Sequence, residues 1–484
     1  MFSPLASRLG NIYGEWVGWR YLAFRYLGLF LLFLSVYATG IYSLLNTKYK
    51  TRIVIGSVVA LYLFFAFRGN LYWFCWDNWS TCGLTFAILV TLALNRKFSV
   101  INLVLLAVLS GITTLFRLPS ISMVPVSLLL LFLICRSNRF SFSKTVSILL
   151  VYVGFFILTV FVIITLLYGS FPAYVTAFDE NPVMQHSLSQ ITLPFFGYLI
   201  LCLAIAFLNL IFEKGIGRIR KRYHGWLKNI FLSLIFLCVL VMIFPRQYGI
   251  DRLATVILGI IDYALFVLFV YGKKTGNRKL MVAAVTIFFL SAVESIGSNM
   301  GYFKSLTWPA IPLIAMLLGN KFTRNQRILC CFWGVAFVIV SLIVQIRYWN
   351  ENSYEIKGNN VLSGMRANSE WGEKIDAVLE NVGPYIQDGY APIVVREGNK
   401  YIWEYLFMAP NRHQRHLFNN WWAFDDEQYV AAIQEDMENS QKPPIILYMQ
   451  WENPEEDNRM VSMLKRNAVC VVNEPGFSFW MKKE

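Results

Sequence analysis

The sequence predicts an α-helical polytopic membrane protein with about twelve transmembrane helices and a small C-terminal α/β domain outside the membrane. Three observations support this fold class. The 484 residues are 57% hydrophobic with a mean hydropathy of +0.51, above the apolar share of soluble domains. Apolar runs, mostly of about 17 residues or more, recur from Leu22 to Ile346 and are long enough to cross a bilayer. After Ile346 the chain becomes polar and acidic.

The apolar runs define a membrane domain over residues 21–347. Residues 1–20, which are polar and aromatic, are expected to form a surface segment on the outer face. The eleventh run is short, so it is either partly re-entrant or extended by its flanks. The expected spans cover residues 22–45, 52–68, 80–96, 99–116, 120–136, 145–168, 190–212, 228–245, 253–272, 279–296, 306–319 and 328–347.

The net charge of +14 combines two parts of opposite sign. Residues 351–484 contain 13 basic and 21 acidic residues, a net charge of −8, so residues 1–350 have a net charge of +22. Short basic loops on the cytoplasmic side of a membrane explain that excess without a nucleic-acid partner.

Every second loop of the membrane domain is basic, which predicts its sidedness. Basic loops face the cytoplasm, so Asp77, Arg117 and Glu294 are expected on the outer face. Met1 then starts outside, and we expect either a further helix upstream of Met1 or a true N-out topology. The basic loops lie at residues 46–52, 95–97, 136–139, 213–222, 273–279 and 321–327.

Residues 348–484 are predicted to form a soluble extracytoplasmic α/β domain. A linker precedes a helix that includes Trp371–Glu380, and an amphipathic helix is expected near Asp426–Asn439. Short strand-like runs alternate with these helices, as in a small α/β domain. The strand-like runs are Pro392–Val395, Pro444–Tyr448, Ala468–Val472 and Phe477–Trp480.

Acidic residues are scarce before this domain, and Asp77 is the most prominent of them. It lies in the stretch Arg68–Thr81, among five aromatic residues between two apolar runs. A charged residue at a membrane face needs a partner or a function, so Asp77 is a candidate catalytic acid or base. The alternative is an aromatic belt with one solvated carboxylate.

Cations on the same expected face are candidates for binding a phosphate. Arg117 ends a span, and its guanidinium has the planar fork that binds phosphate in bidentate fashion. Lys304 and Arg246 are candidates for the same site, although an arginine at a helix end also snorkels to lipid headgroups. The polar segment Glu294–Asn299, together with Arg68, would line a cavity, unless the segment is a plain turn.

No motif typical of soluble enzymes stands out. His413 and His416 are spaced as two ligands one helical turn apart, but no acid or cysteine is close to them in sequence, and a solvated stretch explains them better. We therefore expect no specific cofactor, and the use of a divalent metal stays open. Cys75 and Cys82 would be about 10 Å apart on a helix, too far for a disulfide.

The order of features resembles the polytopic GT-C glycosyltransferases, which use polyprenyl-phosphate sugars on the outer membrane face. Three segments within residues 1–347 support the resemblance. Ser3–Leu5 followed by Trp19–Gly28 is similar to the family's jaw segment and its entry into a membrane helix, and Trp73–Trp79 to its aromatic-polar stretch. Gly111–Pro119 is similar to its Gly…Thr-Arg-Leu-Pro helix end. The family begins with a helix and a catalytic Asp loop, whereas this chain begins after that point.

The resemblance implies transfer of a hexose or pentose from a lipid-linked sugar donor to an envelope glycan, lipid or protein acceptor. Arg117, with Lys304 or Arg246, would bind the donor phosphate, and Asp77 would be the acid that remains. It implies an integral protein of a bacterial inner membrane, with membrane lipid around it and a role in polysaccharide biosynthesis. The alternatives are a catalytically silent glycolipid-binding relative, a transporter or flippase, and a polysaccharide polymerase or ligase.

Overall fold

In a computed structural model, the chain forms two compact units. The first comprises residues 1–11 and 25–346, and the second comprises residues 12–24 and 347–484. A few isolated positions are described besides the continuous ranges. The continuous ranges are residues 4–18, 20–47, 76–179, 264–293, 307–319, 324–356, 364–388, 392–396, 427–439, 445–449, 459–474 and 477–483.

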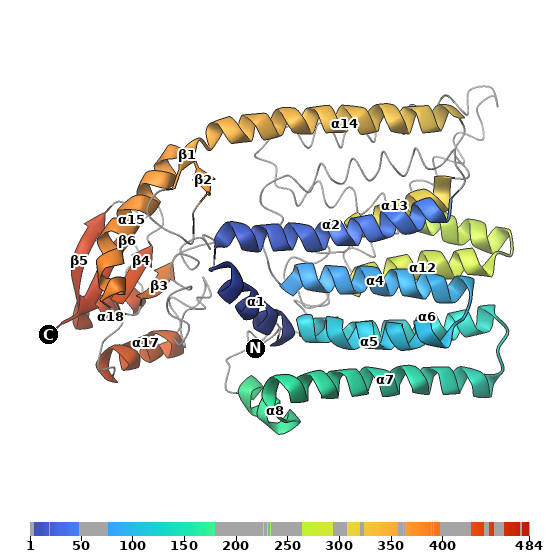
Figure 1. Cartoon of the computed structure of the whole chain (residues 1–484), viewed down its shortest axis with the longest axis horizontal. Helices are drawn as coiled ribbons and strands as arrows, with labels where there is room; N and C mark the ends of the chain where they lie inside the picture. The colour runs from blue at the N-terminus through green and yellow to red at the C-terminus, as the bar shows by residue number, and fades with distance from the viewer. Residues whose placement is uncertain are drawn as a thin grey trace. The chain divides into compact units, whose positions relative to one another are not determined.

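The first unit consists of long apolar helices, several of which lie side by side in Figure 1. Ser141 caps α7 by accepting a hydrogen bond from the Lys144 amide at 3.3 Å, and Asn277 caps α12 in the same way. Three of these helices, α1, α2 and α14, have one end among the residues of the second unit. The helices are α1 (Pro4–Val17), α2 (Tyr21–Leu45), α4 (Trp76–Arg96), α5 (Val100–Phe116), η1 (Leu118–Ser122), α6 (Met123–Ser137), α7 (Phe142–Tyr168), α8 (Phe171–Asp179), α12 (Arg278–Ala292), α13 (Thr307–Gly319) and α14 (Arg324–Glu351).

Four described helical segments are long and apolar enough to cross a membrane, as an integral membrane protein requires. Their bounds follow the first, third, fifth and sixth expected spans closely, and α5 forms a shorter apolar helix at the fourth. The four segments are Leu22–Leu45, Asn78–Arg96, Leu118–Ser137 and Phe142–Tyr168. The spans expected at 52–68, 190–212 and 228–245 fall almost entirely outside the described residues, so a total of twelve stays a prediction.

Helices α4 and α5 approach each other closely at a glycine. A Cβ atom on Gly83 would overlap the hydroxyl oxygen of Thr113, so only glycine fits there without a shift. One turn away on each helix, the rings of Trp79 and Phe116 stack at 4.9 Å between centroids and 17° between planes. On the other side of α5, a Cβ on Gly111 would lie 2.9 Å from Cγ2 of Thr159 in α7. Small residues therefore bring three helices together, as is common in membranes.

Aliphatic side chains fill the core between these helices. Leu84, Leu106, Leu130, Ile287 and Leu313 come from five different helices and are fully buried in one cluster. Buried hydroxyls lie beside this cluster and bond locally: Ser110 donates to the Leu106 carbonyl at 2.8 Å and accepts from the Tyr152 hydroxyl at 2.8 Å. Because hydrocarbon offers no acceptors, these bonds offset the free-energy cost of burying the two hydroxyls.

Three of the six predicted basic loops meet at one end of the first unit, as contacts of Asn46, Asn95, Arg96 and Lys279 show. The Arg96 guanidinium donates to Oδ1 of Asn46, and Lys279 Nζ donates to the Arg96 carbonyl at 2.8 Å. The Asn95 amide donates in turn to the Lys279 carbonyl at 2.7 Å. The sequence placed these loops on one face of the membrane, and the contacts bring α2, α4 and α12 together there.

The expected N-terminal surface segment contains a helix, α1, and residues 12–24 of the chain group with the second unit. The Tyr13 hydroxyl donates to the Ala23 carbonyl at 3.0 Å, and its ring meets Phe24 edge-on at 5.3 Å. These contacts fold the end of α1 back against the start of α2. Ile12 and Trp16, four residues apart, are 54% and 82% exposed, so α1 presents apolar side chains on its surface.

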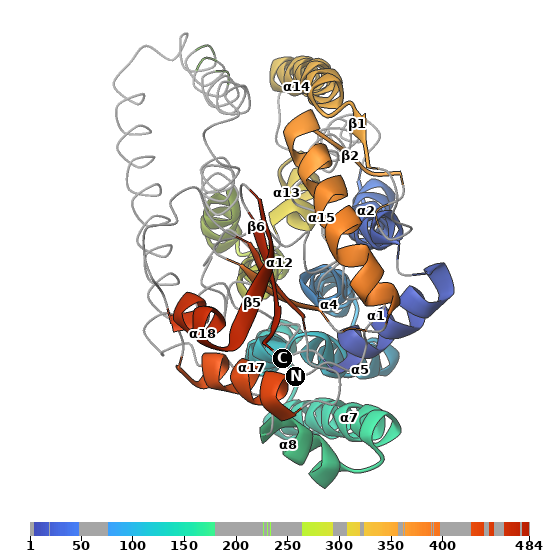
Figure 2. The same ribbon diagram turned by 90° about the vertical axis from the view of Figure 1, so that its left-hand side faces the viewer.

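The second unit contains a four-stranded sheet in the order β3-β4-β6-β5. Strands β3 and β4 are parallel, and the other two pairs are antiparallel. Figure 2 shows α15 on one side of the sheet and α17 and α18 on the other. The strands and helices of this sheet layer are β3 (Pro392–Arg396), β4 (Ile445–Met449), β5 (Ala468–Glu474), β6 (Phe477–Lys482), α15 (Ser369–Gln387), α17 (Glu427–Asn439) and α18 (Arg459–Asn467).

Alternation along the strands explains this layering. Ile446 and Trp480 are register partners that pack with α17 and α18, whereas Phe479 meets Tyr385 of α15 at 5.1 Å between ring centroids. All four strand-like runs predicted from sequence form strands, and the two predicted helices form α15 and α17. The sequence reading missed α18 and the short hairpin of β1 (Tyr354–Glu355) and β2 (Arg366–Ala367).

The hairpin of β1 and β2 connects α14 to α15. The Tyr354 hydroxyl donates to Oδ2 of Asp376 at 2.5 Å, and this bond, with burial, raises the pKa of the tyrosine. A Cβ on Gly372 would overlap the Tyr354 ring. Gly372 therefore lets the ring pack directly against α15.

Replacing Gly83 by Ala should lower the stability of the first unit by about 1–3 kcal/mol, because the new methyl overlaps the Thr113 hydroxyl. The measurement is the thermal unfolding midpoint of the purified chain in detergent. Gly154→Ala in α7 is the matched control, since nothing lies within 4 Å of its Cβ position. Adding Thr113→Ala to Gly83→Ala should restore most of the loss, and an equal loss in both glycine variants contradicts the prediction.

Replacing Gly372 by Ala should destabilise the second unit by about 1–3 kcal/mol, because the methyl displaces the Tyr354 ring from α15. Gly383→Ala on the same helix has open space around its Cβ and should be neutral or stabilising. Limited proteolysis of the full chain reports on both variants. Equal cleavage rates for the two would show that the ring does not depend on Gly372.

Candidate functional site

Arg117 is the central residue of the site because its charged side chain is buried, with only 3% of its surface exposed. It follows the last residue of α5, in an extended conformation that ends the helix, and its amide donates to the Thr113 carbonyl at 3.1 Å. Its own carbonyl accepts from Ser120 at 2.8 Å and starts the short helix η1. Pro119 fits there because the first residues of a helix need no intrahelical amide donor. The motif Arg-Leu-Pro thus fixes the backbone of Arg117 at a turn between α5 and α6.

The first turn of α4 lies against this turn. Trp79 stacks on Phe116, the residue before Arg117, and the hydroxyls of Ser80 and Ser120 are 3.0 Å apart and buried. The Asn78 amide donates to the Gly28 carbonyl of α2 at 3.3 Å. The consecutive residues Asn78, Trp79 and Ser80 therefore contact α2, α5 and η1, respectively.

Asp77 is the residue before Asn78 and lies in the same turn of α4, at the same end of the unit as Arg117. The structure places its backbone and leaves its side chain outside the description. An acid at a helix N-terminus and a cation at a C-terminus both interact favourably with the helix dipoles. Asp77 begins α4 and Arg117 ends α5, so both charges suit antiparallel neighbours without any catalytic role.

Because it is buried, the Arg117 guanidinium could also bind an anion, in addition to this structural role. A charge away from water interacts strongly with an anion, and the guanidinium fork matches two phosphate oxygens. An acid at the same end would serve as a base for a hydroxyl. The arrangement thus suits an anionic substrate whose reacting group lies at one end of the helices.

Several residues predicted for this site lie outside the described residues. These are Arg68, Arg246, Glu294, Asn299 and Lys304, and with them His413 and His416. Of the predicted site residues, the structure brings Asp77 and Arg117 to one end. Sequence reasoning missed Ser80 and Ser120, although each lies within three residues of a predicted site residue.

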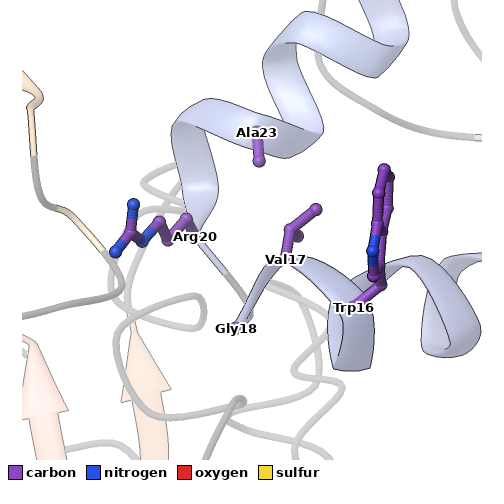
Figure 3. A pocket seen from close by; sticks show the side chains of 5 residues that line it. All are labelled: Trp16, Val17, Gly18, Arg20 and Ala23. Carbon is purple, nitrogen blue, oxygen red and sulfur yellow. The ribbon is translucent and has the colours of Figure 1, made fainter.

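A separate open pocket of about 640 Å³ lies at the bend between α1 and α2 in the second unit (Figure 3). Trp16, Val17 and Ala23 form its apolar wall, while the Arg20 side chain points to the other side of the bend. Gly18 adopts φ 65°, which lets the chain reverse between the helices. The sequence predicted no role for this bend beyond the resemblance of Trp19–Gly28 to the entry into a membrane helix.

The described residues contain no group of three or more His, Cys, Asp or Glu side chains that would hold a metal ion. No family model, curated protein or solved structure matches the chain. The site is therefore interpreted from its own residues.

Removing one hydroxyl of the Ser80–Ser120 pair should destabilise the first unit by about 1–3 kcal/mol, because the partner is left buried without its bond. Replacing both serines by Ala should cost less than the sum of the single changes. Thermal unfolding of Ser80→Ala, Ser120→Ala and the double variant gives the coupling energy. Strictly additive losses would show that the two hydroxyls do not interact.

Proposed function

We propose that the protein transfers a sugar from a polyprenyl-phosphate donor to an envelope glycan, lipid or protein acceptor at the outer face of a bacterial inner membrane. The observation that carries the proposal is the burial of Arg117 beside the turn of α4 that contains Asp77. The order of sequence motifs, including Gly111–Pro119, supports the same family of reactions.

In the proposed reaction, Arg117 binds the donor phosphate through two hydrogen bonds and stabilises the charge that develops as it leaves. The acceptor hydroxyl attacks the anomeric carbon, and the bond from that carbon to the phosphate oxygen breaks. The electron pair stays on the phosphate, while the Asp77 carboxylate takes the proton of the hydroxyl. The products are the glycosylated acceptor and polyprenyl phosphate.

The positions of both residues support these roles. Arg117 is held by the α5–η1 turn, and Trp79, Ser80 and Phe116 hold the α4 turn against it. Such a framework keeps a phosphate-binding group in place without reorganisation during the reaction. Lys304 and Arg246 are proposed as further cations around the phosphate, with Arg68, Glu294 and Asn299 lining the cavity.

Replacing Arg117 by Lys should weaken binding of a short-chain polyprenyl phosphate about tenfold or more, because lysine keeps the charge and loses the fork. Binding is measured by thermal stabilisation of the purified chain. The uncharged polyprenol is the reference ligand, which the parent and Arg117→Lys should bind equally. Arg466→Lys, an exposed position in the second unit, is the matched control. Equal affinity of parent and Arg117→Lys for the phosphate removes Arg117 from the site.

Asp77→Asn separates chemistry from binding in the same assay. It should keep affinity for polyprenyl phosphate and lose transfer from polyprenyl-phosphate hexoses or pentoses by a factor of about 10²–10⁴. A parent chain that binds the lipid phosphate but transfers no sugar would instead identify a silent glycolipid-binding protein.

A further inference from the structure

The end of the first unit opposite Arg117 is strongly cationic. Between Asp77 and Asp179 the sequence contains no acidic residue. Five cations from two loops are exposed at this end, and we call them the basic face: Arg96, Lys97, Arg136, Arg139 and Lys144. Since the same stretch of chain supplies no counter-charge, an external anion would be attracted to this surface.

The two loops of the basic face are in contact. Phe98, which follows Lys97, meets Phe140 edge-on at 5.2 Å between ring centroids. Lys144 Nζ lies over the Phe140 ring at 4.2 Å from its centroid. The aromatic pair therefore joins the α4–α5 and α6–α7 loops, and Lys144 of the basic face lies on it.

The α6–α7 loop is held by its own hydrogen bonds. The Phe140 amide donates to the Cys135 carbonyl at 3.0 Å, and the Arg139 amide donates to the Arg136 carbonyl at 3.2 Å. Arg139 adopts φ 58°, which directs the chain back toward α7. A loop fixed in this way loses little conformational entropy when an anion binds.

Exposed apolar side chains border the cations directly. Val100 and Ile101 at the start of α5 are 63% and 79% exposed, and Phe142 at the start of α7 is 80% exposed. A soluble anion would match the cations alone. A ligand with a charged head and hydrocarbon chains matches both the cations and their apolar border.

We propose that the basic face binds the phosphate headgroups of anionic glycerophospholipids, whose acyl chains lie along the exposed starts of α5 and α7. Lys97, Arg139 and Lys144 hold the phosphate around the Phe98–Phe140 pair. Arg96 is already bonded to Asn46 and keeps the helix ends together. This site is independent of sugar transfer at Arg117.

The test compares lipids retained by the purified full-length chain in neutral detergent, counted by native mass spectrometry. The probes are dioleoyl phosphatidylglycerol and dioleoyl phosphatidylcholine. The parent should retain the anionic lipid preferentially, and the triple variant K97Q/R139Q/K144Q should bind it about tenfold or more weakly. Binding of the zwitterionic lipid should stay unchanged.

Two matched variants keep the result specific. R466Q/K482Q/K483Q removes three exposed cations from the second unit and should retain the parent's lipid preference. The charge-conserving K97R/R139K/K144R should retain it too, which separates a headgroup site from a folding defect. Equal retention of both lipids by the parent, or an unchanged preference in K97Q/R139Q/K144Q, overturns the proposal.

Discussion

The close approach of α4 and α5 at Gly83 is the constraint on which the candidate site depends. Without a Cβ at this position, Thr113 of α5 comes close to the α4 backbone. That spacing brings Trp79 onto Phe116 and Ser80 to Ser120 in the adjacent turns. The position of Arg117 thus follows from a packing contact between small residues, as expected in an environment without a strong hydrophobic driving force between helices.

The charges of the first unit complement this packing. Two antiparallel helices place an N-terminus and a C-terminus at each end, and both termini carry partial charges. Asp77 and Arg117 match these partial charges at one end, so their structural and proposed chemical roles are compatible. Burial of the Arg117 guanidinium costs desolvation free energy. Because the guanidinium is then little screened by water, it interacts more strongly with any anion that reaches it.

The two ends of the same helices differ in chemistry. One end holds the buried Arg117 and the first turn of α4, which includes Asp77, next to the stacked Trp79 and Phe116, and this suits a specific reacting group. The other holds exposed cations with apolar borders around Phe98 and Phe140, which suits a surrounding lipid. In the described loops at that second end, between Asp77 and Asp179, every charged residue is a cation.

The sequence by itself determined the membrane class, the bounds of the spans Leu22–Leu45 and Phe142–Tyr168, and the strands of the C-terminal sheet, because these follow from local hydrophobic length and alternation. It singled out Asp77 and Arg117 because charges are rare in apolar surroundings. Only the tertiary structure decided that Trp79 stacks on Phe116 and that Ser80 meets Ser120, on either side of Arg117 in the sequence. Those contacts join residues about 40 positions apart, and such pairings depend on helix packing that no local pattern encodes.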